Sequence, residues 1–287
     1  MENLRGSLLM VAAMAGFAIE DMFVKSMSAR LPVGEILALL GAGGAIIYAI
    51  FARVRGERLI NRDLIAGSVI LRNLGELVGT IAFVSAIVFT PLAQASAILQ
   101  ATPLAVTLGA ALFLGETVGW RRWSAITVGF VGVLIVIRPG TEGFSALSLF
   151  AVVAVLGLAG RDVATRRVPG AITSLQLATY GFGVLVPAGL ILAWVMGTPL
   201  VAPDAVEWAQ IAGALVAGTA GYYALIAAMR LGEVAVITPF RYTRLVFALI
   251  IGWLVFDEAV DTATLLGGAV IVASGLYTLL REARLRR

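Results

Sequence analysis

Four charged residues in this sequence fall inside long apolar segments, where a charge is costly and marks a function or an internal ion pair. Arg72 and Glu76 are four residues apart and therefore share one face of a helix. Arg241 and Arg244 are three apart and also share a face. Three guanidinium groups facing one carboxylate leave a net positive charge. This set could therefore bind an anionic or zwitterionic ligand, or it could only fix how the helices pack.

Neutral polar residues lie beside these charges or at similar depth in the neighbouring segments. With them, the predicted substrate-binding set is Arg72, Asn73, Glu76, Gln100, Arg241, Tyr242 and Arg244. Glu76 and Arg244 fall near mid-depth of segments that start on the same side. We therefore expect these two side chains to meet across the centre of the protein.

Two further features of the apolar segments could carry chemistry or movement. Glu20 and Asp21 are adjacent carboxylates near the end of the first apolar segment. They could form a coupling site for a proton or cation, or they could be an ordinary helix end with Lys25 as the partner of Asp21. Pro103 and Pro239 lie within apolar segments, where a proline frees a backbone carbonyl and permits bending, so both are candidate gating positions.

The composition excludes several kinds of chemistry. There are no Cys and no His residues, so disulfides, thiolate catalysis and zinc sites built from these residues are excluded, and no metal site is expected. The sequence has no GxxxxGK[ST] run, no predicted cofactor and no catalytic residue set. An intramembrane enzyme is the competing interpretation, and the sequence lacks the nucleophiles and acid–base pairs that such an enzyme needs.

The elements that must position these residues are membrane-spanning helices. Hydrophobic residues make up 60% of the 287 residues, the mean hydropathy is +0.99, and apolar blocks of about 20 residues repeat along the chain. A polypeptide in lipid must satisfy its backbone within the segment, which favours an all-α membrane protein. The expected spans are 5–24, 33–52, 65–89, 92–114, 119–137, 145–160, 171–196, 206–229, 234–256 and 260–280.

The charges at the ends of these ten spans predict the orientation. Fifteen of the 21 Lys and Arg residues fall on one side, three fall on the other, and three lie inside spans. The positive-inside rule therefore places both termini in the cytoplasm. The net charge of +4 is explained by the same loops, so no nucleic-acid partner is expected. The expected partners are the lipid bilayer and a small-molecule substrate, with a monomer as the working oligomeric state.

An internal repeat is visible at an offset of 142 residues. Segment 110–116 (AALFLGE) and segment 252–258 (GWLVFDE) each end an apolar run before a short hinge, and the offset aligns Glu116 with Glu258. Five spans per copy is an odd number, so the second copy must be inverted in the membrane. We therefore predict two inverted five-helix repeats, residues 1–138 and 145–287.

These halves resemble the EamA branch of the drug/metabolite transporter superfamily. The resemblance rests on segments 95–116 and 234–258, although the second half has Leu245 where the first has Pro103. Within that branch the chain is similar to YddG-type amino-acid exporters. The resemblance implies a secondary transporter in the bacterial inner membrane that exports amino acids, aromatic ones among them, or similar small metabolites. The alternative is an importer or exchanger of another metabolite, such as a vitamin or a nucleoside-like compound.

Overall fold

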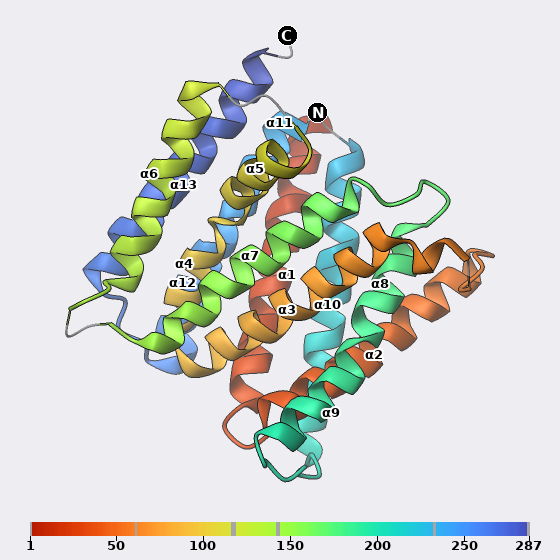
Figure 1. Ribbon diagram of the computed structural model, residues 1–287. Coiled ribbons are helices and arrows are strands. Elements are labelled where there is room, and N and C mark those ends of the chain that lie inside the picture. The colour runs from red at the N-terminus through yellow and green to blue at the C-terminus, as the bar shows by residue number, and fades with distance from the viewer. Residues whose placement is uncertain (1, 61, 116–118, 142–143, 232–233, 286–287) are drawn as a thin grey trace.

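The protein is a bundle of helices in a computed structural model that describes residues 2–60, 62–115, 119–141, 144–231 and 234–285 (Figure 1). These described ranges contain helices and loops and no β-strand. The α-helices are α1 Glu2–Met27, α2 Val33–Val54, α3 Gly67–Phe89, α4 Leu92–Leu99, α5 Thr102–Phe113, α6 Trp120–Ile137, α7 Leu149–Thr165, α8 Ser174–Gly183, α9 Leu185–Val195, α10 Ala205–Leu231, α11 Val234–Ile237, α12 Thr243–Phe256 and α13 Thr262–Leu285.

Eight of the predicted spans are long and apolar enough to cross a membrane. The segments Trp123–Ile137 and Thr262–Thr278 are apolar but shorter. The prediction of an all-helical membrane protein is therefore confirmed, while the number of spans in a bilayer stays a prediction. Both termini lie at the same end of the bundle (Figure 1), which we call the terminal end; the end that carries the α1–α2 turn is the opposite end.

Three predicted spans are interrupted. The span expected at 92–114 breaks between α4 and α5 at Gln100 and Ala101, directly before Pro103. The span expected at 234–256 contains a 3₁₀ segment, Thr238–Tyr242, that includes Pro239. Proline cannot donate the next helical hydrogen bond, which explains both of these positions. The third interruption separates α8 from α9 at Val184, three residues before Pro187.

The principal helix contacts join the first half of the chain to the second. Helix α1 packs along α10, α3 along α7, α6 along α13, and α2 along both α8 and α9. Glycine lines these contacts. A Cβ added to Gly75 would lie 2.8 Å from the carbonyl oxygen of Gly157, and one added to Gly132 would lie 2.9 Å from that of Gly267. Small residues let helix backbones approach closely in a membrane, where side-chain burial alone does not drive association.

The apolar core is concentrated at the opposite end. One large cluster joins buried residues of the α1–α2 turn, the α3–α4 turn and the start of α7, among them Met27, Ile36 and Leu92. Towards the terminal end the buried apolar residues divide into two separate clusters. One lies between α1, α10 and α11, and the other joins α3 to the residues around α8. The helices are therefore tied together at the opposite end and are less closely joined at the terminal end.

Candidate functional site

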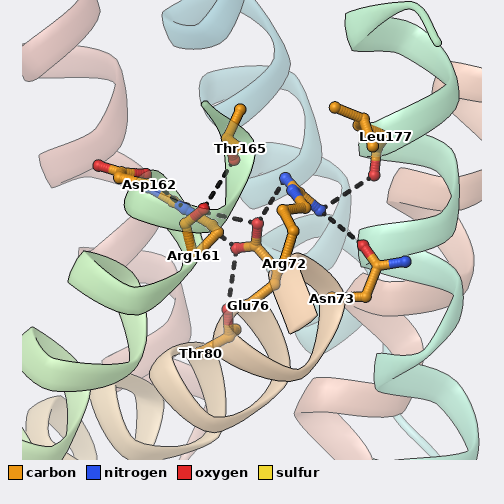
Figure 2. Close-up of polar contacts among 8 residues, drawn as sticks. All are labelled: Arg72, Asn73, Glu76, Thr80, Arg161, Asp162, Thr165 and Leu177. Atoms are coloured by element: carbon orange, nitrogen blue, oxygen red, sulfur yellow. Dashed lines mark hydrogen bonds and ion pairs between the residues drawn. The ribbon is translucent and has the colours of Figure 1, made fainter. Parts of the chain in front are cut away.

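Glu76 lies at the centre of a charged network between α3 and α7 (Figure 2). Its carboxylate accepts from Arg72, at 2.8 Å on the same helix, and from Arg161 of α7, at 3.2 Å. Arg161 also donates to Asp162 at 2.8 Å. The two carboxylates and two guanidinium groups neutralise one another, as side chains this deep in a membrane protein must.

Arg72 is held from a third helix as well. Its Nη1 donates to the side-chain oxygen of Asn73, at 3.0 Å, and to the carbonyl oxygen of Leu177 in α8, at 3.1 Å. Gly181, one turn further along α8, leaves the space that this guanidinium occupies, because a Cβ there would lie 2.5 Å from Nη1. The predicted residues Arg72, Asn73 and Glu76 are thus brought together, and the contacts with Arg161 and Leu177 fix α3 against α7 and α8.

Arg244 pairs with Asp21 and not with Glu76. Its Nη2 lies 2.7 Å and 2.9 Å from the two carboxylate oxygens of Asp21, and its guanidinium stands over the rings of Phe17 and Phe83 at 5.5 Å and 5.2 Å. The prediction that Glu76 and Arg244 meet is therefore wrong. Similar depth on two helices does not define which helices face each other.

Lys25 joins three segments at the opposite end of the bundle. The predicted local pair between Asp21 and Lys25 is wrong, because the ammonium group lies 2.9 Å from Glu258, beyond α12. The same ammonium donates to the carbonyl oxygens of Ile87 and Thr90 at 2.9 Å and 2.7 Å. One side chain of α1 therefore holds the α3–α4 turn and the hinge after α12. The repeat partner of Glu258, residue 116, lies outside the described residues.

Arg241 and Glu20 are charged groups that no other described side chain neutralises directly. Among the described residues neither makes an ion pair or a hydrogen bond, whereas Arg72, Arg161 and Arg244 all do. Arg241 is exposed and lies within electrostatic reach of Arg161, Asp162 and Arg244. An exposed arginine beside an already neutralised network can bind an anionic group supplied from outside the protein.

Gln100 and Tyr242 are buried between helices. Gln100 donates through Nε2 to the backbone carbonyl of Tyr242 at 3.1 Å, across the 142-residue repeat offset. The Tyr242 hydroxyl lies against the backbone of Gly275 in α13. These contacts join α4, α12 and α13, so both side chains serve helix packing in this conformation.

The sequence missed Arg161, Asp162 and a group of aromatic residues. The span expected at 145–160 ends too early, because α7 continues to Thr165 and carries Arg161 and Asp162 into the bundle. The signal available in the sequence was that Arg161 lies only one residue beyond the expected end of the span at 160, where a helix can continue. The rings of Tyr48 and Tyr222 lie 5.4 Å apart in an edge contact, and Phe182 lies 5.4 Å from Tyr48.

An ion pair outside the long spans joins α6 to α13. Arg138 ends α6 and donates to Asp261 at 2.7 Å, and Asp261 also accepts from the backbone N–H of Thr264 at 2.7 Å. Partial burial pushes the pKa of Asp261 upwards, but hydrogen bonds from Thr264 and the charge of Arg138 outweigh burial. They hold the pKa below its ordinary value.

Known proteins match this chain along its whole length. It is 28% identical over 273 residues to the pseudopaline exporter of Pseudomonas aeruginosa, with 94% of each chain covered. It is 26% identical to a riboflavin transporter of Vibrio cholerae, covering 99% of this chain and 96% of that one. It is 23% identical to an S-adenosylmethionine uptake transporter of Rickettsia prowazekii, covering 98% and 94%. A crystal structure at 19% identity has the same fold, with a TM-score of 0.66 over 98% of this chain.

The family assignment rests on two matches within one chain. The model of the EamA-like transporter family matches residues 4–138 and again residues 146–280. Its relatives are named transporters of small metabolites, and the helices described above are long and apolar enough for a membrane. The chain therefore belongs to the EamA-like transporter family and is a membrane transporter of small metabolites.

Proposed function

We propose that this protein exports amino acids, aromatic ones among them, or similar small metabolites that carry a negative charge, by alternating access across a bacterial inner membrane. The observation that carries the proposal is the exposed Arg241, which makes no ion pair with the described residues and lies beside the Arg72–Glu76–Arg161 network. A guanidinium in a membrane protein is stabilised by an anion, and a carboxylate can accept two of its N–H groups.

Two inverted five-helix halves, 1–138 and 145–287, supply the moving parts in this proposal. The pairing of helices supports it. A half-to-half exchange turns the α1–α10 contact into the α7–α3 contact, and both are extensive. The same exchange maps Gly79, which packs on Leu158, onto Gly221, which packs on Gly16. Repeats arranged in this way can rock about a central site.

The remaining predicted residues keep their proposed roles. Pro103 and Pro239 stand at breaks where α4–α5 and α11–α12 can bend. Glu20 and Asp21 are the proposed coupling residues. Asp21 holds α12 through Arg244, so a change of charge at this pair would loosen α1 from α12. Gln100 and Tyr242 would contact substrate only if the helices part during the cycle.

A second candidate is import of a vitamin or nucleoside-like compound. It is favoured by the similarity to the riboflavin and S-adenosylmethionine uptake transporters, whereas the similarity to the pseudopaline exporter favours export. The residues around Arg241 would bind an anionic group in either direction. Direction of net flux must therefore be measured.

A reconstituted flux screen tests the proposal. Liposomes loaded with amino acids, riboflavin or S-adenosylmethionine are compared with and without a pH gradient. Arg241→Gln should reduce flux of the transported compound by at least about tenfold, because a lost charge-assisted hydrogen bond costs about 1.5–3 kcal/mol. Arg58→Gln, an exposed loop arginine, is the matched control and should leave flux unchanged. Unchanged flux in Arg241→Gln would contradict the assignment of this residue.

A further inference from the structure

Glu20 is a carboxylate of α1 whose positive partner the described part of the protein does not supply. Arg244 lies within electrostatic reach of Glu20, but it is bound to Asp21 through both carboxylate oxygens. The like charge of Asp21 adds to the need for a cation beside Glu20. An unneutralised carboxylate inside a membrane protein is costly, so Glu20 must either take up a proton or be neutralised by a cation from outside the protein.

The carboxylate of Glu20 has a shaped seat between α1, α2 and α10. It rests against Gly218 of α10, where an added Cβ would lie 2.7 Å from the carboxylate carbon. Tyr48 of α2 lies within electrostatic reach, and its ring meets the edge of Tyr222. Aromatic rings beside a carboxylate are the surroundings that bind organic cations in proteins.

The other half of the molecule has a charged contact at the corresponding place. At the offset of 142 residues that relates the two family matches, Glu20 corresponds to Asp162 and Gly218 corresponds to Glu76. In the α3–α7 contact Glu76 binds Arg161, the neighbour of Asp162. In the α1–α10 contact Glu20 supplies a carboxylate, but the position that corresponds to Arg161 is Ile19. Among the described residues, the arginine of this contact is therefore present in one half only.

We propose that Glu20, Tyr48 and Gly218 form a site for a cationic group of the substrate, so that the transported molecule is dipolar and spans from Glu20 to Arg241. The proposal rests on the proposed function but assigns Glu20 to the substrate in place of coupling, which it leaves to Asp21. It names the substrate class: an organic ammonium or similar cation at one end and a carboxylate or other anion at the other. It excludes a simple anion as the preferred substrate.

A series of linear ω-amino acids tests this inference and measures the spacing of the two charges. Binding to the purified full-length protein is measured for chains of increasing length. For each length the matched fatty acid and the matched alkylamine are measured alongside. We expect one length to bind at least about tenfold more tightly than its matched acid, because a second charge-assisted contact is made.

Variants separate this site from the anion site. Glu20→Gln should remove the preference for the ω-amino acid and leave binding of the matched acid unchanged, whereas Arg241→Gln should weaken both. Gly218→Ala keeps the carboxylate but fills its seat, and should also reduce the preference; Glu2→Gln, an exposed position on the same helix, is the control. Binding is measured at two pH values to distinguish a bound organic cation from a bound proton.

Three outcomes bear on the inference. If acids bind through Arg241 but no ω-amino acid gains from Glu20, the cation site is refuted while the proposed function stands. If Glu20→Gln changes only the pH dependence of binding, Glu20 holds a proton, and the inference is again overturned. If neither acids nor metabolites bind the wild-type protein and Arg241→Gln changes nothing, the proposed function itself fails.

Discussion

At the scale of single residues, Glu76 and Arg244 are each held by several groups. Glu76 has two arginines, and Arg244 has one carboxylate and two aromatic rings. The cost of removing a member is therefore set by the partners that remain, which are then left without a counter-charge. Glu20 and Arg241 differ, because removing either leaves no paired side chain behind among the residues that the structure describes. Substitutions of the two kinds of residue should therefore have different effects on the thermal midpoint of unfolding.

Glu76→Gln should lower the thermal midpoint of the purified protein. Both Arg72 and Arg161 would face a neutral amide, at a cost of about 1–3 kcal/mol for a buried group left unsatisfied. Glu20→Gln should leave the midpoint unchanged or raise it. The comparison is made by differential scanning fluorimetry with Glu2→Gln as the control. An unchanged midpoint for Glu76→Gln would show that the network contributes nothing to stability.

Asp261→Asn should make stability less dependent on pH in the acid range. The pKa of Asp261 is lowered on folding, so its contribution is present above the unfolded pKa of about 3.9 and is lost as the pH falls through the lower folded value. The wild-type midpoint should therefore fall more steeply than that of the variant between about pH 5 and pH 3. Parallel pH profiles would contradict this sign.

At the scale of helices, hydropathy and charge predict where most helices lie, while the contacts between helices require the structure. The ranges 33–52 and 119–137 agree with α2 and α6 within two residues, because long apolar runs define spans directly. The predicted end of the sixth span, at residue 160, was wrong, because α7 continues through Arg161 to Thr165. The partners of Glu76 and Arg244 were wrong because they depend on which helices are neighbours, and apolar periodicity carries no such information.

Pro103→Ala should slow turnover more than it weakens substrate binding. Pro103 stands at the start of α5, directly after the break, and alanine would favour one continuous helix from Leu92 to Phe113. Flux and equilibrium binding are measured for the same compound. Pro187→Ala is the matched control, because Pro187 also follows a helix break. Equal loss of flux and binding would show that the break only shapes the site.

At the scale of the whole molecule, the buried apolar residues form one large cluster towards the opposite end and two small clusters towards the terminal end. The large apolar cluster and the contacts of Lys25 both lie towards the opposite end, while the arginines face helices that are less closely joined at the terminal end. Both termini share one end in Figure 1, in agreement with an even number of spans. These features lead to one prediction on topology and one on opening.

Cysteine introduced at Arg58 and at Pro199 should react from opposite sides of the membrane. Both positions are exposed; Arg58 lies in the loop after α2 and Pro199 in the loop after α9. The chain has no Cys of its own, so each variant carries a single thiol. Labelling with an impermeant maleimide, before and after lysis, reports the side. Reaction of both from the same side would refute the predicted topology.

Lys25→Gln should open the opposite end more often. The variant loses the ion pair to Glu258 and the bonds to the carbonyl oxygens of Ile87 and Thr90. A cysteine at the fully buried Ala95 of α4 should then react roughly tenfold faster with an external thiol reagent, if about 1.4 kcal/mol of closure is lost. Lys25→Arg keeps the charge and serves as the control. Equal reaction rates in all three backgrounds would show that Lys25 does not control access.

The pairing of helices across the two halves has a consequence for biogenesis. Helices α1, α3 and α6 find their main partners in α10, α7 and α13, all of which are synthesised later. During insertion, the helices of the first half therefore enter the membrane before their main partners are synthesised. At that stage Glu76 can pair with Arg72 but not yet with Arg161. The insertion machinery would have to protect the first half of the chain until the second half is made. A break in synthesis after residue 138 should leave a fragment that quality-control proteases remove.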